Sequence, residues 1–438
     1  MADLNQMLKL LGELDDQLVA CMRCGLCQSV CTVYAETGRE TDVARGKIAL
    51  LEFLGHEMIK DAKGVKDRLD KCLLCGSCQA ACPSGVPTLD IFLKARAIVT
   101  AYIGLSPAKK AIFRGMLTKP KLFNNILSLG STFQGLFTKP VNDVIGSSCS
   151  RFLSPLLGDR HLLPLAAKPF RKTGDINTAP GKSGLKVALF YGCMVDKVFP
   201  NIGEAMLKAL NHHGVGVYMP TAQACCGVPS LASGDMKSFE ELVRMNLALF
   251  GNGDFDALVT PCGTCTEAFH HVWPLMGANL SQTERDQIAM LASKAMDINA
   301  FLVDKLHVST AKPADQTQKV TIHDPCHLKK SLGVSAQVRT LVSANPHLNV
   351  VEMADADICC GCGGSFNLQH YSLSAKIGKK KRDNIAAVNP DIVTAGCPAC
   401  MMQISDMLSK AGDRIAVKHP IDLYAQGLGQ GAPDQPSS

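Results

Sequence analysis

The arrangement of the cysteines constrains this chain more than any other feature of its sequence. There are 20 cysteines in 438 residues, and most of them fall into four ordered groups. Two groups have four cysteines with the spacing C-x2-C-x2-C-x3-C, and two have five, in the order of a single cysteine, an adjacent pair and a C-x2-C pair. Cys149 and Cys362 lie outside these patterns. Because each pattern occurs twice, the chain is predicted to contain duplicated ligand-holding units.

The four-cysteine groups predict two iron–sulfur clusters. They consist of Cys21, Cys24, Cys27 and Cys31, and of Cys72, Cys75, Cys78 and Cys82. This spacing is the bacterial ferredoxin signature, in which three thiolates of a run hold one [4Fe–4S] cluster and the fourth holds the other. We therefore expect one cluster on Cys21, Cys24, Cys27 and Cys82, and the second on Cys72, Cys75, Cys78 and Cys31. Zinc is the alternative for a C-x2-C pair, but two complete ligand sets disfavour it.

The five-cysteine groups predict a second kind of metal centre. They consist of Cys193, Cys225, Cys226, Cys262 and Cys265, and of Cys326, Cys359, Cys360, Cys397 and Cys400. Zinc needs only four ligands, so five thiolates around one site favour something larger than a single ion. We expect one or two further iron–sulfur clusters here. The alternative is that one of the two groups binds zinc, or no metal, and only stiffens the fold.

Hydrophobic periodicity predicts an α+β multidomain chain in four parts. Residues 1–105 are expected to form a helical ferredoxin domain, with helices over 45–54 and 89–102. Residues 106–183, rich in proline, are expected to form a basic helical connector of short helices. Residues 184–310 and 311–430 are expected to form two similar α/β modules. Strands are predicted at 186–191, 216–219 and 257–260 in the first module, and at 319–323, 348–353 and 391–394 in the second.

Each cysteine group of the two modules follows a predicted strand. Parallel α/β sheets bind their ligands beyond the carboxyl ends of the strands, so the ten cysteines are expected to converge as two groups of five. His323 and His327 flank Cys326 and could tune a cluster, carry protons or be structural. For Cys362 a bystander role is expected, and for Cys149 a structural one.

Charge and composition limit the partners of the chain. The segment from Lys94 to Lys172 contains thirteen lysines and arginines and two aspartates. Its local charge is therefore +11, in a chain of net charge +6. This stretch also carries apolar residues, a combination suited to an anionic membrane surface or an acidic partner, or to a connector packed on its neighbours. No nucleic-acid-binding motif accompanies the charge. The N-terminus lacks the features of a signal peptide, which predicts a cytoplasmic protein, either free or peripheral on the inner face of the cell membrane.

Short sequence motifs resemble those of a known family of iron–sulfur subunits. The five-cysteine groups match the cysteine-rich CCG domain through ACCG at 224–227, PCGTC at 261–265, HDPCH at 323–327, ICCGCGG at 358–364 and GCPAC at 396–400. Together with ACMRCGLCQSVC at 20–31, ARGKIALLE at 44–52 and CLLCGSCQAACPSGVP at 72–87, they resemble the iron–sulfur subunits of glycolate oxidase and of FAD-linked D-lactate dehydrogenases. Heterodisulfide reductase and anaerobic glycerol-3-phosphate dehydrogenase subunits share the same order of modules.

The resemblance implies an electron-transfer subunit of an oxidoreductase complex. Neither a G-x-G-x-x-G fingerprint after a strand nor a P-loop is evident in the sequence. Because iron–sulfur clusters move single electrons, oxidation of a 2-hydroxy acid is expected on a separate FAD-binding subunit. Electrons would then leave towards a quinone or another carrier. Two alternatives are a catalytic subunit of the heterodisulfide reductase type and the iron–sulfur subunit of a glycerol-3-phosphate dehydrogenase.

Overall fold

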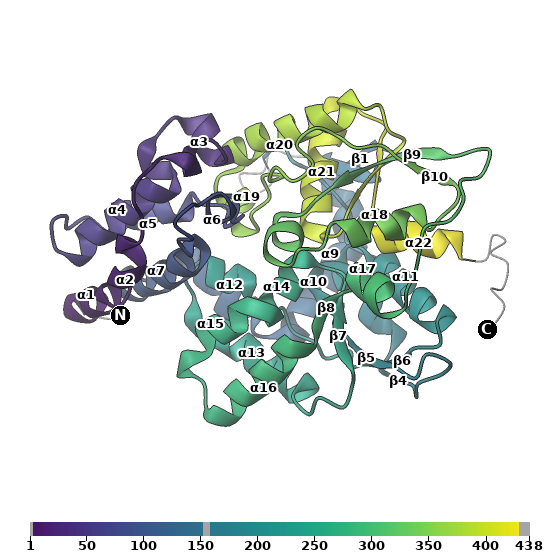
Figure 1. The fold of residues 1–438 in the computed structure, drawn as a ribbon, viewed down its shortest axis with the longest axis horizontal. Coiled ribbons are helices and arrows are strands. Elements are labelled where there is room, and N and C mark those ends of the chain that lie inside the picture. The colour runs from purple at the N-terminus through teal and green to yellow at the C-terminus, as the bar shows by residue number, and fades with distance from the viewer. Residues whose placement is uncertain (1–2, 152–157, 429–438) are drawn as a thin grey trace.

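The computed structural model describes residues 3–151 and 158–428. Helices at the N-terminal end form one body, and two sheets with their covering helices form the other (Figure 1). The mixed α and β architecture, with a helical N-terminal part and two α/β repeats, confirms the fold class expected from the sequence. No helix among the described residues is long and apolar enough to cross a membrane.

The N-terminal part is helical throughout, and the predicted helices are present. A helix predicted over 45–54 runs over Ala44–Gly55, and the one predicted over 89–102 runs over Thr88–Ile103. Short helical turns, marked η, separate several of the helices. The elements are α1 (Leu4–Gly12), α2 (Asp15–Val19), η1 (Leu26–Gln28), α3 (Thr32–Thr37), η2 (Glu40–Asp42), α4 (Ala44–Gly55), α5 (Ala62–Asp70), α6 (Ser77–Ala80) and α7 (Thr88–Ile103).

The segment 106–183 differs from the expected series of short helices. It begins with α8 (Pro107–Lys110), η3 (Ala111–Leu117) and the 18-residue α9 (Pro120–Phe137). An antiparallel sheet of β1 (Thr138–Asn142), β2 (Ser147–Ser150) and β3 (His161–Leu162) follows, and then η4 (Phe170–Thr173) and β4 (Ile176–Asn177). The prediction of a helical connector was therefore wrong for its second half. Asn142, Ser147 and His161 hydrogen-bond to α21 (Pro398–Ala411) or the loop after it, so this sheet is held by tertiary contacts that local sequence patterns do not reveal.

The first α/β module is built on a five-stranded sheet. Its strand order is β4-β6-β5-β7-β8, and every pair is parallel except β4 with β6. Strand β7 is buried at every position, as expected for a sheet covered on both faces. The elements are β5 (Lys186–Leu189), α10 (Gly192–Lys197), α11 (Pro200–His212), β6 (Gly216–Met219), α12 (Val228–Ala232), α13 (Met236–Phe250), β7 (Ala257–Thr260), α14 (Gly263–Glu267), η5 (Ala268–Val272), α15 (Trp273–Met276), η6 (Gly277–Asn279), α16 (Gln282–Lys294), β8 (Ala295–Asp297), α17 (Ile298–Ala300) and η7 (Phe301–Lys305).

The second module repeats this design with four parallel strands in the order β10-β9-β11-β12. In both modules the strand that precedes the single cysteine lies beside the strand that precedes the C-x2-C pair, so the two sheets present equivalent edges. The elements are β9 (Gln318–His323), η8 (His327–Ser331), α18 (Ala336–Ser343), β10 (Leu348–Val350), α19 (Ser365–Gln369), α20 (Tyr371–Ala387), β11 (Ile392–Ala395), α21 (Pro398–Ala411), β12 (Ala416–Lys418) and α22 (Pro420–Gly427).

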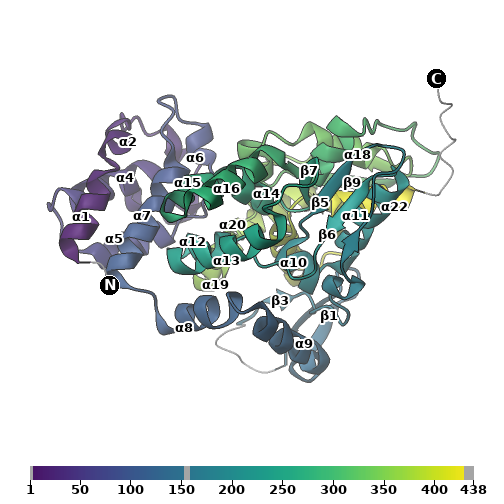
Figure 2. The same ribbon diagram turned by 90° about the horizontal axis from the view of Figure 1, so that it is seen from below.

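Contacts between the parts fix their relative positions. Helix α22 of the second module packs against α11 of the first, and α3 of the N-terminal domain packs against α20. Helix α7 also packs against α12 of the first module, so the N-terminal helices contact both modules, and α8 and α9 run along the lower edge of the view in Figure 2. Arg96 strengthens the contact between the N-terminal domain and the first module, because its buried guanidinium donates to the carbonyl oxygens of Ala232 at 2.6 Å and Cys72 at 2.7 Å.

Candidate iron–sulfur centres

One cavity of the N-terminal domain gathers the first three cysteines of the first run with the last cysteine of the second. Cys21, Cys24, Cys27 and Cys82 line it together. The chain turns tightly here because Arg23 and Gly25 adopt left-handed conformations with φ of 56° and 91°. Only glycine adopts that conformation without strain, and a Cβ on Gly25 would lie 2.7 Å from the Arg45 guanidinium. This is the grouping of thiols that the sequence predicts for the first [4Fe–4S] cluster.

A second cavity gathers the remaining four cysteines of the two runs. Cys31, Cys72, Cys75 and Cys78 line it, and Leu74 and Gly76 repeat the left-handed turn of the first run. Burial raises the pKa of the Cys31 thiol to about 11 and that of Cys78 to about 12. These thiols are therefore protonated in the metal-free chain near neutral pH, and metal binding would displace their protons.

A buried lysine lies beside this second set of cysteines. Lys47 of α4 is 1% exposed, lines the same cavity and donates from Nζ to the carbonyl oxygen of Asp42. Burial lowers its pKa, whereas the nearby Cys72 and Cys31 act to raise it. Sequence analysis did not single out Lys47, although it lies within the word ARGKIALLE. A cation in this place would stabilise a negatively charged cluster.

The ten cysteines of the two modules line one central cavity. It has a volume of about 1000 Å³, part of it open to solvent, and all ten predicted cysteines border it. The two groups meet at the edges of the two sheets, where the Sγ atoms of Cys262 and Cys397 are 4.0 Å apart. Cys193 and Cys326 are partly exposed, and the other eight are buried. The cysteines of each module thus converge beyond the strand ends, as the sequence predicts.

Cys362 belongs to this central cavity as well. It is 3% exposed and lines the wall with the second group of cysteines. The bystander role favoured from sequence remains a prediction, although the spacing Cys360-Gly361-Cys362 already placed it beside a ligand pair. Cys149 lies instead in β2 of the three-stranded sheet, where it pairs with Lys139 and His161.

The second module differs from the first in its histidines. His323, at the end of β9, is fully buried, and its ring nitrogen Nδ1 lies 3.1 Å from the carbonyl oxygen of Ala356. Burial lowers its pKa to about 3. His327 lines the central cavity, and its Nε2 lies 2.9 Å from the carbonyl oxygen of Leu74 in the N-terminal domain. Of the two, His323 lies within ligand distance of cysteines and His327 contacts the neighbouring domain.

The second cavity of the N-terminal domain adjoins the second module. Leu73 and Leu74, which lie between Cys72 and Cys75, also line the central cavity. The neighbouring Cys359 thiol, together with burial, raises the pKa of Cys75 well above its ordinary value, and Cys75 packs against the buried cluster that contains Leu73 and Cys359. The cysteines of the chain therefore form one continuous interior series rather than separate patches.

The donor sets fit iron–sulfur clusters. Thiolates are soft ligands that bind iron–sulfur clusters and zinc. The two N-terminal cavities bring together the cysteines of the exchanged grouping of a two-cluster ferredoxin, and Cys78 borders both of them. Oxidation to disulfides is not observed, because all 20 cysteines are free. When bound, such clusters accept and donate single electrons.

Comparison with known proteins agrees with this interpretation. Residues 17–86 match the 4Fe-4S dicluster domain, and residues 187–270 and 320–405 match the cysteine-rich CCG domain. The chain therefore belongs to the iron–sulfur proteins in which a 4Fe-4S dicluster domain precedes two CCG domains.

Within this class, the chain is similar over nearly its whole length to the probable glycolate oxidase iron-sulfur subunit of Bacillus subtilis. The two are 29% identical over 432 residues, which is 95% of each chain. Lactate utilization protein A 2 of Bacillus cereus is 28% identical over 244 residues, 56% of this chain and 99% of that protein. These relatives confirm the resemblance drawn from the motifs and support an electron-transfer role.

Two further comparisons concern parts of the chain and its fold. One of the subunits of the fumarate reductase (CoM/CoB) of Methanothermobacter marburgensis is 32% identical over 271 residues, 60% of this chain and 52% of that protein. The crystal structure of a hypothetical protein from Helicobacter pylori covers 99% of this chain and 78% of its own, with a TM-score of 0.52 and 10% identity. That likeness shows the fold alone.

Proposed function

We propose that this chain is the iron–sulfur subunit of an FAD-dependent dehydrogenase that oxidises D-lactate or glycolate. A partner flavoprotein would oxidise the 2-hydroxy acid and deliver electrons singly to this chain. The observation that carries the proposal is the continuous series of cysteine groups through the interior, from the N-terminal domain through the second module to the first. A series of this kind suits a protein that conducts electrons and does not itself bind the organic substrate.

The contacts between the groups support one order of electron transfer. The group of Cys21, Cys24, Cys27 and Cys82 shares the side chain of Cys78 with the neighbouring cavity. Cys75 of that neighbouring cavity packs against the buried cluster that contains Cys359 of the second module, and Cys397 lies 4.0 Å from Cys262 of the first module. We propose that the 18 cysteines named above hold two [4Fe–4S] clusters and two further centres in this order.

The connector supplies a surface for the far end of this series. Helix α9 carries no acidic residue, and its apolar side chains are 42–65% exposed on one face: Leu122, Ile126, Leu129, Phe133 and Leu136. Lys119 and Lys139 flank it, and Lys121 lies in its first turn. An exposed apolar stripe with basic flanks is typical of helices that lie in the surface of an anionic membrane. We therefore propose that α9 places the chain at the inner face of the cell membrane.

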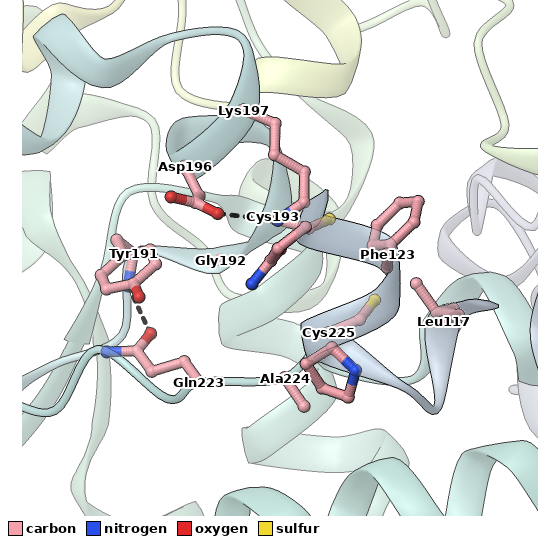
Figure 3. A pocket seen from close by; sticks show the side chains of 12 residues that line it. Leu117, Phe123, Tyr191, Gly192, Cys193, Asp196, Lys197, Gln223, Ala224 and Cys225 are labelled. Carbon is pink, nitrogen blue, oxygen red and sulfur yellow. Dashed lines mark hydrogen bonds and ion pairs between the residues drawn. The ribbon is translucent and has the colours of Figure 1, made fainter. Parts of the chain in front are cut away.

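The same helix borders the first module's cysteines. Phe123 and Asn124 of α9 line a small pocket with Tyr191, Cys193 and Cys225 (Figure 3). Lys197 donates to Asp196 at 2.7 Å at its rim. A carrier that reaches the chain from the membrane, such as a quinone, would meet the first module at this pocket. The flavoprotein would then bind near the exposed Cys24 of the N-terminal domain, at the opposite end of the series.

The central cavity favours one alternative function. It is large, partly open and lined by cysteines of both modules, so a disulfide substrate could reach a metal centre directly. The similarity to part of a fumarate reductase that is named for CoM and CoB is consistent with this alternative. In that case the chain itself would reduce a disulfide, as in heterodisulfide reductase.

Anaerobic affinity purification of the full chain from its own cells separates these functions. Co-purification of an FAD-binding protein, together with dye reduction that depends on D-lactate or glycolate, supports the proposed function. Reduction of a heterodisulfide by the chain alone with an artificial electron donor supports the alternative. Zinc in place of iron and acid-labile sulfide contradicts both.

Vesicles with and without anionic lipid test α9, because the paired change Leu129→Ser and Phe133→Ser should abolish co-sedimentation.

A further inference from the structure

The two modules differ at one buried position next to their cysteines. Three residues before the first cysteine of each group lie Phe190 in the first module and His323 in the second. The strand registers make these positions equivalent, because Val187 pairs with Ala257 as Val320 pairs with Ile392. Both side chains are fully buried. An aromatic hydrocarbon in one module is thus replaced by an imidazole in the other.

Packing explains the phenylalanine but not the histidine. Phe190 packs edge-on against Phe250 and Phe269, with ring centroids 6.1 and 4.9 Å away. His323 has a polar nitrogen, Nε2, that is buried without a hydrogen-bond partner among the described residues. A buried polar atom without a hydrogen-bond partner destabilises the fold. Only one of the two duplicated modules has such an atom at this position. This indicates that a group other than the described protein atoms binds it.

The hydrogen bonding of the ring determines what kind of ligand fits. The partner of Nδ1 is the carbonyl oxygen of Ala356, which only accepts, so Nδ1 carries the proton and donates. The neutral ring then has a free lone pair on Nε2. Lys381, which is 1% exposed, donates from Nζ to the same carbonyl at 3.1 Å and to that of Asp355 at 2.5 Å. Together with the backbone N–H of Asp324, which donates to the same carbonyl at 3.0 Å, Lys381 holds the carbonyl that fixes the tautomer and the ring orientation.

The imidazole of His323 lies near two cysteines of the second group. The ligand atoms of His323, Cys360 and Cys400 all lie within 4.8 Å of one another. Ligands of a tetrahedral metal with bonds of about 2.0–2.3 Å are separated by roughly 3.6 Å, so a small adjustment of the side chains would bring the three onto one metal atom. Imidazole and thiolate together suit iron and zinc.

We propose that Nε2 of His323 binds an iron atom of the second module's centre, together with Cys360 and Cys400. The inference rests on the proposed iron–sulfur function. The second centre would then have mixed nitrogen and sulfur ligands, whereas the first, with Phe190 in the equivalent place, would have sulfur ligands alone.

Nitrogen-15 labelling of histidine tests this directly in the full chain purified anaerobically. Electron–nuclear double resonance of the reduced and oxidised protein should show one directly bonded nitrogen. His323→Phe, which installs the residue of the first module, should lose this coupling and leave the signals of the other centres unchanged. His327→Gln is the matched control and should retain the coupling, because Nε2 of His327 contacts Leu74 instead.

Each outcome decides the proposal. Iron-bearing protein without a directly bonded nitrogen would overturn it, even if His323→Phe fails to fold, because that measurement needs no variant. A coupling that persists in His323→Phe would also overturn it. Protein without iron would refute the iron–sulfur function itself. Zinc bound by a nitrogen donor in otherwise iron-loaded protein would show that His323 binds a metal but would overturn its assignment to iron.

Discussion

Removal of the buried charge of Lys47 should lower the potential of the cluster held by Cys31, Cys72, Cys75 and Cys78. Lys47 is 1% exposed and lines the same cavity as these cysteines. A positive charge stabilises the more negative, reduced cluster and so raises its potential. For an assumed separation of about 7 Å and an effective dielectric constant of about 20, the interaction is worth about 2.4 kcal/mol. For one electron this corresponds to about 100 mV.

The assay is a redox titration of the full chain followed by electron paramagnetic resonance. Lys47→Met keeps the length of the side chain and removes the charge, and its second-cluster signal should shift by about 100 mV to lower potential. Lys63→Met is the control, because Lys63 lies on α5 of the same domain with its side chain 79% exposed. Because water screens this exposed charge, its removal should leave the cluster potential nearly unchanged. An unchanged second-cluster potential in Lys47→Met, with the cluster intact, would refute the reasoning.

Three further predictions concern ligands, backbone and pH. Cys24→Ser should remove one N-terminal cluster signal. Cys226→Ser should leave both N-terminal signals and alter only a signal from the modules. Loss of every signal from either change would contradict separate sites. Gly361→Ala should destabilise the chain by more than about 2 kcal/mol in urea unfolding, because φ is +89° and the new Cβ would lie 2.7 Å from the carbonyl oxygen of Ser374. Gly412→Ala is its control, with φ of +77° but open space around the new atom, so equal losses would argue against the steric clash. The metal-free chain should lose stability as pH rises above about 9, because unfolded thiols ionise near pH 8.5 while the pKa of Cys31 is about 11 and that of Cys78 about 12 in the fold. Urea unfolding at pH 8 and pH 10 measures this, and equal stabilities would contradict the raised pKa values.

Regular elements were predictable where local pattern and burial agree. Strands β6 and β7 lie at the predicted residues, and β9 and β11 are displaced by one residue at one or both ends. Fully buried parallel strands have short, nearly continuous apolar sequences, so these segments could be recognised. The grouping of Cys82 with the first run, and of Cys31 with the second, was predicted from the ferredoxin signature, in which the last cysteine of each run leaves the turn that the other three form.

Features that depend on tertiary contact were not predictable. The three-stranded sheet after α9 lacks a continuous apolar pattern, and its hydrogen bonds to the far end of the chain hold it in place. Buried Lys47 and Lys381 resemble surface residues in the sequence, and only the fold shows that neither reaches solvent. What the sequence lacked in each case was the identity of the neighbour.

The central claim is that this chain conducts electrons from a flavoprotein along its cysteine-bound centres. The most direct test mixes the anaerobic full chain with the FAD-binding protein that co-purifies with it and adds D-lactate or glycolate in a stopped-flow spectrometer. The account predicts loss of iron–sulfur absorbance that requires both the partner and the substrate. Reduced partner flavin that leaves the iron–sulfur absorbance unchanged would contradict it.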